Sequence, residues 1–143
     1  MKLTKELLKE RFAEYNKAYF NGELGPCKFG FLYKSDGLYG KFCAQENRSG
    51  KLIGRIMLGT SIEWNEERLR SVLVHEMIHM YVRIVEGCWF DGLLGHGRRF
   101  RRHRRRLKRD YGLQIDIHGN YEHIDKKLDP KRWERVLLWL IDW

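Results

Sequence analysis

Apolar side chains recur every three or four positions near the start of the chain, and this period predicts an amphipathic helix over residues 4–20. The apolar positions of the pattern are Leu8, Phe12, Tyr15 and Tyr19. Thr4 is a suitable N-cap, because its hydroxyl can accept a hydrogen bond from the first turn. Asn21 and Gly22 interrupt the pattern, so we expect the helix to end there and to cover the core.

The next three segments are short, aromatic or aliphatic, and separated by turn-forming residues, which is typical of strands. They span residues 27–33, 38–44 and 52–58. Turns are expected at residues 35–37 and 47–50, which are rich in Ser, Asp, Asn and Gly. Because connections this short favour antiparallel neighbours, we expect a small antiparallel meander. The pattern leaves open which strand lies at the edge.

A longer apolar segment predicts a buried helix over residues 65–85. Its apolar side chains point in nearly every direction around the helix: Leu73, Val74, Met77, Ile78 and Met80. Asn65 is the expected N-cap, and the acidic residues of the first turn match the helix dipole. We expect the helix to end at Glu86-Gly87 and to carry one face of the sheet.

Further helices are expected to flank this centre, which gives an α+β fold. One spans residues 98–110 and is closed by Gly112. Its apolar stripe consists of Phe100, His103, Leu107 and Tyr111. Residues 114–118 are expected to form a short strand or an extended segment. A last helix, rich in tryptophan and leucine, is expected from about residue 130 to residue 143, after Asp129-Pro130.

The composition is that of one folded domain over residues 1–143, since 43% of the residues are hydrophobic and 13% are aromatic. The apolar runs are too short for a membrane span, and the charged start of the chain does not resemble a signal peptide. Cys27, Cys43 and Cys88 include no C-x-x-C pair, which argues against a disulfide framework and a zinc ribbon. We expect a cytoplasmic protein, associated with the nucleoid if it is bacterial.

The net charge of +9 comes from one segment, residues 98–109. It holds nine of the 28 Lys and Arg residues and no acid, so the remaining 19 balance the 19 Asp and Glu. The nine are Arg98, Arg99, Arg101, Arg102, Arg104, Arg105, Arg106, Lys108 and Arg109. Such runs are usually solvated surface, but like charges this dense repel one another, and arginine suits phosphate contact. We therefore predict that these nine side chains bind nucleic acid, with an affinity that falls as salt rises.

The buried helix contains the sequence His75-Glu76-Met77-Ile78-His79. Residues four apart lie one turn above each other, so His75 and His79 project the same way and can share a metal ion, for which this pattern favours zinc. Glu76, one position on, can act as a general base without ligating the metal. Two surface histidines on an ordinary helix are the alternative, and the apolar neighbours on nearly every side argue against it.

A catalytic zinc site needs a third protein ligand. The downstream candidates are His96, His103, His118, His123, Glu86 and Asp91. His96 is favoured, because the glycines on both sides of it permit a tight backbone that presents the side chain to the first helix. His103 lies on the apolar stripe of the next helix, where it could instead be a core residue or a partner of the ligands.

These motifs together resemble the SprT-like metalloprotease family, which includes bacterial SprT proteins and eukaryotic Spartan. The resemblance is carried by His-Glu-x-x-His at residues 75–79 and by Gly-His-Gly-x-x-Phe at residues 95–100. Residues 15–24 are similar to the family's opening helix and turn. The resemblance covers roughly residues 5–118, and the combined motifs are much more specific than either alone.

The resemblance implies a zincin-like α+β domain with His75, His79 and His96 on zinc and Glu76 as catalytic base. It also implies DNA-dependent cleavage of proteins crosslinked to DNA. The chain departs from the family in lacking a cysteine-based ribbon and in its denser arginine run. Any DNA contact is therefore expected to come from the domain itself. The loop over residues 86–94 is individual to this chain.

We therefore expect a zinc metalloendopeptidase that hydrolyses peptide bonds of DNA-bound or crosslinked proteins. Two alternatives stay open: a protease for one specific protein substrate without DNA, and a nucleic-acid-binding module with a non-catalytic zinc site. The intact Glu76 argues against the latter, since a structural site needs no base. The donor that stabilises the oxyanion stays open among Tyr111, His118, Tyr121 and the arginines.

Overall fold

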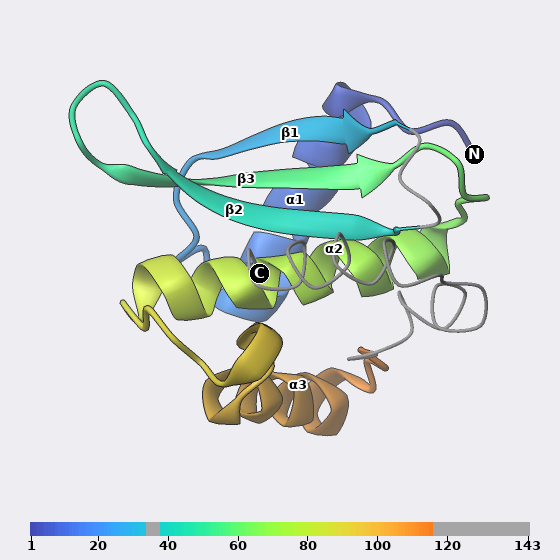
Figure 1. The fold of residues 1–143 in the computed structure, drawn as a ribbon. Helices are drawn as coiled ribbons and strands as arrows, with labels where there is room; N and C mark the ends of the chain where they lie inside the picture. Colours follow the sequence, from blue (N-terminus) through green and yellow to red (C-terminus); the bar gives the residue numbers. More distant parts are fainter. Residues whose placement is uncertain (34–37, 116–143) are drawn as a thin grey trace, which may run out of the picture.

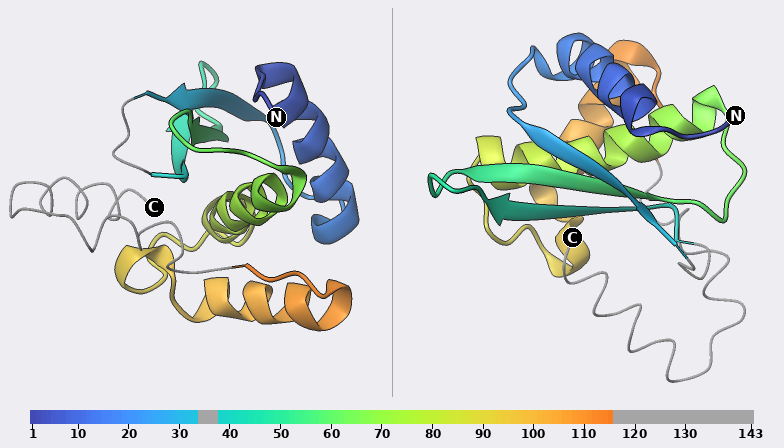
Figure 2. Two further views of the ribbon diagram at one scale, coloured as in Figure 1. Left: turned by 90° about the vertical axis from the view of Figure 1, so that its right-hand side faces the viewer. Right: turned by 90° about the horizontal axis from the view of Figure 1, so that it is seen from above.

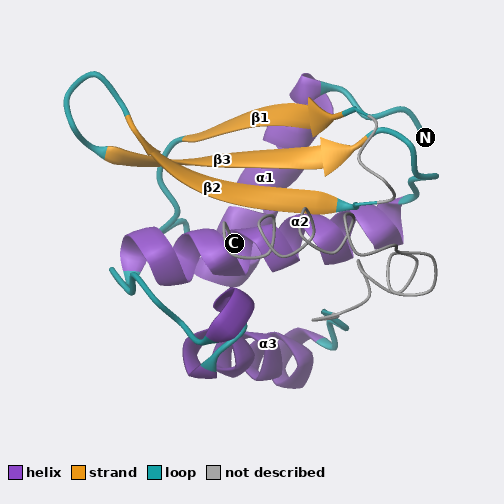
Figure 3. Cartoon of the chain, viewed as in Figure 1, coloured by secondary structure: helices purple, strands orange, loops and turns teal. Residues whose placement is uncertain are grey.

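The computed structural model describes residues 1–33 and 38–115 as an α+β arrangement (Figures 1 and 3). In chain order the elements are α1 (Lys5–Phe20), β1 (Cys27–Leu32), β2 (Gly40–Glu46), β3 (Leu52–Gly59), α2 (Glu66–Met80), the π-helical turn η1 (Tyr81–Val85), the short 3-10 helix η2 (Leu93–Gly95) and α3 (Arg98–Tyr111). The helices and strands predicted within these ranges are present, with ends that differ by a few residues.

The sheet is mixed, and the predicted antiparallel meander is wrong. The strand order is β1-β3-β2, in which β2 pairs antiparallel with β3 and β1 pairs parallel with it. The short turn at Asn47 does join neighbours, but β2, which follows β1 in sequence, pairs with the opposite edge of β3. β3 takes the centre because it is the most buried strand, with Ile56 and Leu58 fully enclosed. Central strands are covered on both edges, so the most apolar segment gains most there.

Three layers follow from the packing of the helices (Figures 1 and 2). α1 and α2 cover the same face of the sheet, and α3 lies on the other side of α2. The strands turn Gly54, Ile56 and Leu58 toward α2, and Phe42 lies beside Ile56 in the register. α1 covers β1, where the rings of Phe12 and Phe29 meet at 5.4 Å between centroids. α2 is thus enclosed between the sheet and α3.

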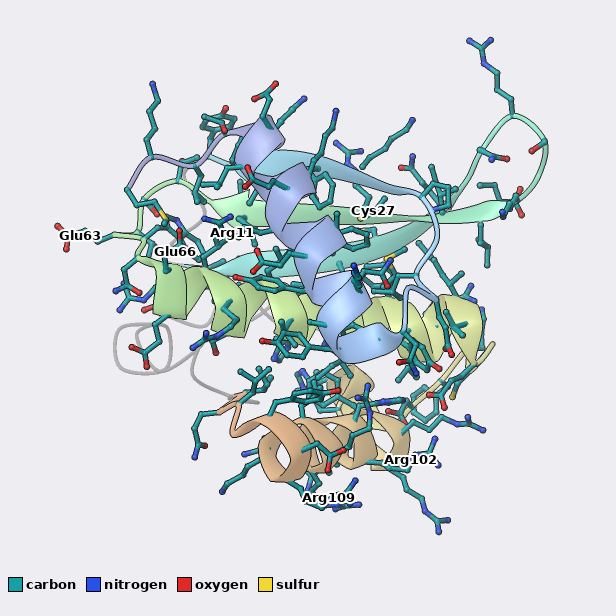
Figure 4. All side chains as sticks on the ribbon, turned by 180° about the vertical axis from the view of Figure 1, so that it is seen from behind. Arg11, Cys27, Glu63, Glu66, Arg102 and Arg109 are labelled. Carbon is teal, nitrogen blue, oxygen red and sulfur yellow. The ribbon has the colours of Figure 1, made fainter. Side chains whose placement is uncertain are left out.

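α1 begins and ends where its sequence predicts. The Thr4 hydroxyl accepts a hydrogen bond from the Leu7 N–H at 3.1 Å, and Asn21 takes the left-handed conformation that ends the helix. The Arg11 guanidinium binds the Glu66 carboxylate through two nitrogens, at 2.7 and 3.1 Å (Figure 4). This bidentate ion pair fastens α1 to the first turn of α2.

α2 is buried on all sides in its second half, as predicted. Asn65 caps it by accepting from the Arg68 N–H at 2.8 Å. Every residue from position 72 to position 80 is less than 9% exposed, with Ile78 and Leu73 at 0%. The predicted extension to residue 85 exists but widens into the π-helical η1. A buried helix of this kind has to satisfy any polar side chain it carries within the protein.

α3 matches the predicted helix, and Gly112 ends it in the left-handed conformation. Phe100, His103 and Leu107 are buried as predicted, whereas Tyr111 is 51% exposed and does not belong to the buried stripe. Gln114 and Ile115 are irregular, and the remainder of the predicted 114–118 segment lies outside the described residues, as does the predicted last helix. Among the helices described, each is too short or too polar to cross a bilayer.

We expect Gly40→Ala to destabilise the fold. The added methyl group would lie 2.9 Å from Glu76 Oε1, 3.0 Å from Val72 Cγ1 and 3.1 Å from Leu58 Cδ2. Overpacking of this kind costs about 1–3 kcal/mol, which urea unfolding measures. Gly30→Ala on the other flanking strand is the matched control, because its methyl group would meet Met57 Cγ at an ordinary 3.5 Å. Equal losses in both variants would contradict the close approach of β2 to α2.

Candidate metal centre

Three buried imidazoles meet at one point between α2 and the start of α3. The Nε2 atom of His79 lies 3.2 Å from that of His75 and 3.2 Å from that of His96. The third side of the triangle, from His96 to His75, is 3.3 Å. All three residues are at most 5% exposed. The structure therefore brings together the two helical histidines and the favoured downstream candidate.

The helix fixes two of these side chains. His75 and His79 are one turn apart on α2, so their rings project to the same side. The ring centroids are 5.0 Å apart, and the surrounding turns of the helix are buried. Their orientation is set by the packing of the whole helix between the sheet and α3.

A compact turn presents His96. Gly92 and Gly95 have φ values of +71° and +72°, and Leu94 between them has φ +66°. Such values are easy for glycine and strained for leucine. Gly97 lies so close to Asp91 that a Cβ there would be 2.6 Å from the Asp91 carbonyl oxygen. The tight backbone predicted from the two glycines that flank His96 is present. Gly95 is needed for its positive φ, and Gly97 is needed for its close approach to Asp91.

Asp91 holds this turn to α3. Its Oδ1 accepts a hydrogen bond from the Arg99 N–H at 3.0 Å, and its Oδ2 accepts one from the Phe100 N–H at 2.8 Å. A carboxylate at a helix N-terminus satisfies unpaired N–H groups and complements the helix dipole. Since Gly97 supplies no capping side chain, Asp91 caps the helix from outside. Asp91 was predicted only as a candidate ligand, and its capping role gives no local sequence signal, because the residues it caps follow eight and nine positions later.

Phe100 packs against all three imidazoles. It is fully buried, and its ring centroid lies 4.8 Å from that of His75, 4.7 Å from that of His79 and 4.8 Å from that of His96. Phe100 was predicted on the apolar stripe of its helix but not at the site. Its contact with three polar rings means that it orients them and covers one side of the cluster.

The cluster fits a metal ion. Neutral imidazole offers one lone-pair nitrogen, and three of these facing one another favour a shared cation. A tetrahedral zinc ion with Zn–N bonds of about 2.0–2.1 Å separates its ligand nitrogens by about 3.3 Å. The observed edges of 3.2, 3.2 and 3.3 Å match this value. Burial, together with the neighbouring His75 and His96, lowers the pKa of His79 well below its usual value, which favours the neutral form that binds metal.

Glu76 is the other buried polar group of α2. Its carboxylate is 0% exposed, and within the described part of the chain neither oxygen has a hydrogen-bond partner. Burial raises its pKa well above the usual value. Oε1 faces the backbone of Gly40 on β2. A fully buried, unpartnered carboxyl is costly, and it is typical of functional sites rather than of structural ones.

The remaining candidate ligands within the described residues have other partners. Glu86 accepts from Arg102 at 2.8 Å and lies 3.1 Å from His103 Nε2, while Asp91 caps α3. His103 is buried against the Tyr81 ring, so the predicted alternative of a core residue describes it better than that of a ligand. Burial outweighs Glu86 and lowers the pKa of His103. His118, His123 and Tyr121 lie outside the described residues, and Tyr111 packs its exposed ring against Tyr19.

The basic residues of α3 divide into two groups. Six use their side chains within the protein: Arg99 pairs with Glu86 at 3.5 Å, Arg101 Nε donates to the His96 carbonyl, Arg102 to Glu86, Arg104 to the Ile115 carbonyl, Arg106 to the Tyr19 carbonyl, and Arg109 to Asp110. Arg98, Arg105 and Lys108 are exposed and make no side-chain hydrogen bond or ion pair with the other described residues. Figure 4 shows Arg102 and Arg109 on α3 at the side of the molecule away from the sheet. The run therefore fastens α3 in place as well as charging its surface.

Comparison with known proteins agrees with the geometry. A family model described as the SprT-like family matches residues 8–119, which is most of the chain and includes all three histidines, Glu76 and α3. No curated protein matches the chain closely enough to add to this result.

Zinc is expected to bind one per chain and to stabilise the folded state. At a free concentration 100 times its Kd, the free energy of unfolding should rise by about 2.7 kcal/mol, because the unfolded chain lacks the triangle of nitrogens. A chelator should reverse the gain in thermal unfolding. His79→Ala should lose the stabilisation, whereas His103→Gln, a buried histidine outside the triangle, should keep it. A gain of the same size in His79→Ala would contradict the site.

Proposed function

The chain belongs to the SprT-like family, and we propose that it is a zinc-dependent endopeptidase. The observation that carries the proposal is the triangle of three buried Nε2 atoms, together with the buried Glu76 carboxyl next to His75 on α2, which has no hydrogen-bond partner among the described residues. In the proposed site His75, His79 and His96 hold zinc. A bound zinc ion would polarise the scissile carbonyl and lower the pKa of a water molecule toward about 7.

Glu76 is proposed to move the proton. Its carboxylate accepts a proton from the attacking water and passes it to the leaving amine, which needs a group that is charged before attack and neutral after it. Burial raises the pKa of the Glu76 carboxyl well above its usual value, and the positive charge of a zinc ion bound beside it would favour the charged carboxylate that a general base needs. Phe100 supports the site by shielding the imidazoles on one side, so that the polar groups act in a water-poor setting.

We expect Glu76→Gln to keep zinc and the fold while lowering kcat for an unfolded protein substrate by about 10²–10⁴-fold, the usual contribution of a positioned base. Glutamine has the same shape but cannot take the proton. The matched control is Glu67→Gln, an exposed acid in the first turn of the same helix, which should leave kcat unchanged. Undiminished cleavage by the Glu76→Gln protein would sink the assignment of the base.

The substrate is proposed to be protein held on DNA. Support comes from the outer face of α3, where Arg98, Arg105 and Lys108 repeat at seven and ten positions and so share one side of the helix. Phe100, on the opposite side, touches the histidines. DNA bound to the outer face would therefore lie about one helix diameter from the histidines, with the proteins that it holds near the proposed zinc. A protease for one acidic protein partner is the competing candidate.

The charge-reduced triple variant of Arg98, Arg105 and Lys108, each replaced by Gln, is expected to weaken DNA binding. The slope of log K against log salt should become shallower by up to about three, since each lost phosphate contact removes one released counterion. Fluorescence anisotropy with duplex and single-stranded oligonucleotides measures the binding constant and its dependence on salt. The control is the same triple replacement at Lys5, Lys9 and Lys17, exposed on α1. Equal losses in the two triples would argue for unspecific charge attraction and against a site on α3.

A further inference from the structure

A cavity of about 560 Å³ opens beside His79. This volume is inside the range of roughly 300–1,000 Å³ that is typical of ligand pockets. One wall is the β2 segment from Phe42 to Ala44, and the other is the segment from Cys88 to Gly92. The cavity therefore reaches from the edge of the candidate metal centre to the loop that is individual to this chain.

The floor of the cavity is formed by the residues that continue the chain immediately after α2. Val82 and Arg83 come three and four positions after His79, so they lie on the same side of the helix one turn further along. The π-helical η1 carries both residues, and such wider turns occur frequently at functional sites. A group bound on this floor would lie one turn away from the histidine cluster.

Two aromatic side chains on the outer wall are exposed to an unusual degree. Trp89 is 80% exposed and Phe90 is 70% exposed, although both line the cavity. Their backbone is held in place: the Cys88 N–H donates to the Val82 carbonyl at 2.9 Å, and the Cys88 thiol donates to the Phe90 carbonyl at 3.3 Å. Neighbouring exposed aromatic residues on an anchored loop are typical of a binding surface.

Arg83 supplies the positive charge of the cavity. Asp91 also lines it, but both of its carboxylate oxygens accept hydrogen bonds from the start of α3. Within the described part of the chain, the Arg83 guanidinium makes no hydrogen bond or ion pair of its own. The cavity therefore combines apolar walls with one cation that no described residue pairs with, and the part of the cavity beside Arg83 disfavours a positively charged side chain.

We propose that this cavity selects the polypeptide substrate by taking up a bulky apolar side chain next to the bond that is cut. Trp89 and Phe90 determine the preference for that side chain, and Arg83 discriminates against lysine and arginine at the same position. The inference rests on the proposed protease function, because it takes the histidine cluster as the reacting centre. A nucleobase could also stack on exposed aromatic residues, but the opening beside His79 favours the substrate that is proposed to react there.

Binding and cleavage are measured separately with one set of short blocked alanine peptides in which one central position holds Leu, Phe, Gly or Lys. Binding is measured by calorimetry with the zinc-incubated Glu76→Gln protein. The Leu and Phe peptides should bind at least about tenfold more tightly than the Gly peptide, the discrimination that an apolar pocket gives. The Lys peptide should bind most weakly.

In the Glu76→Gln protein, a further Trp89→Ala or Phe90→Ala replacement should bring the ratio of the affinities for the Leu and Gly peptides close to one. A further Arg83→Gln replacement should remove the discrimination against the Lys peptide. Tyr33→Ala is the matched control, because Tyr33 is 73% exposed at the end of β1 and does not line the cavity. A ratio of one in the parent protein, or the same loss in the control, would overturn the proposal. A loss of single-stranded oligonucleotide binding instead of peptide binding in Trp89→Ala would overturn it in favour of base stacking.

Cleavage of the same peptides by the protein with Glu76 intact distinguishes the two proposals. Selective binding without any cleavage would refute the protease and leave the peptide pocket standing. Cleavage without preference at any position would leave the protease standing and overturn the pocket. Cleavage with the bulky side chain fixed at one position beside the cut bond, lost in Trp89→Ala, is the result expected.

Discussion

The burial of three imidazoles and one carboxyl inside the apolar core is the constraint on which this structure depends. Polar groups placed there lose their hydration, and each needs compensation from the protein or from a bound ion. The histidines meet in a triangle whose size suits one metal ion. Glu76 has no such compensation among the described residues. The core therefore keeps a polar cluster that costs stability, and function is the usual reason for such a cost.

The surrounding elements serve this cluster from different directions. The sheet approaches α2 closely at Gly40 and Gly54, where even an added methyl group would be crowded. Phe100 covers the imidazoles from α3, and Asp91 ties the start of that helix to the turn that presents His96. The two glycines and Phe100 join α2 to segments distant in sequence, whereas the Asp91 contacts are local. Several elements hold the site at once, which is the arrangement that precise geometry requires.

How far the sequence predicted the structure depended on the range of each interaction. Thr4 and Asn65 were identified as caps, since a capping side chain bonds to residues three positions away. The sheet order was not, because the pairing of β1 with β3 is decided by which strand is most buried in the finished fold. The third histidine was favoured from its glycine neighbours, whereas the cap by Asp91 and the exposed position of Tyr111 arise only from tertiary packing. The cavity gave no signal in the sequence beyond an individual loop.

The loop before α3 has two parts that tolerate mutation to different degrees. From Asp91 to Phe100 the backbone is fixed by the aspartate cap, the crowded Gly97 and three positive φ values. Trp89 and Phe90, immediately before it, are exposed, so replacing either one removes little packing from the core. Mutations can therefore accumulate at these two positions while the histidine cluster stays intact. The fold separates a segment that evolution can vary from an adjacent one that it must conserve.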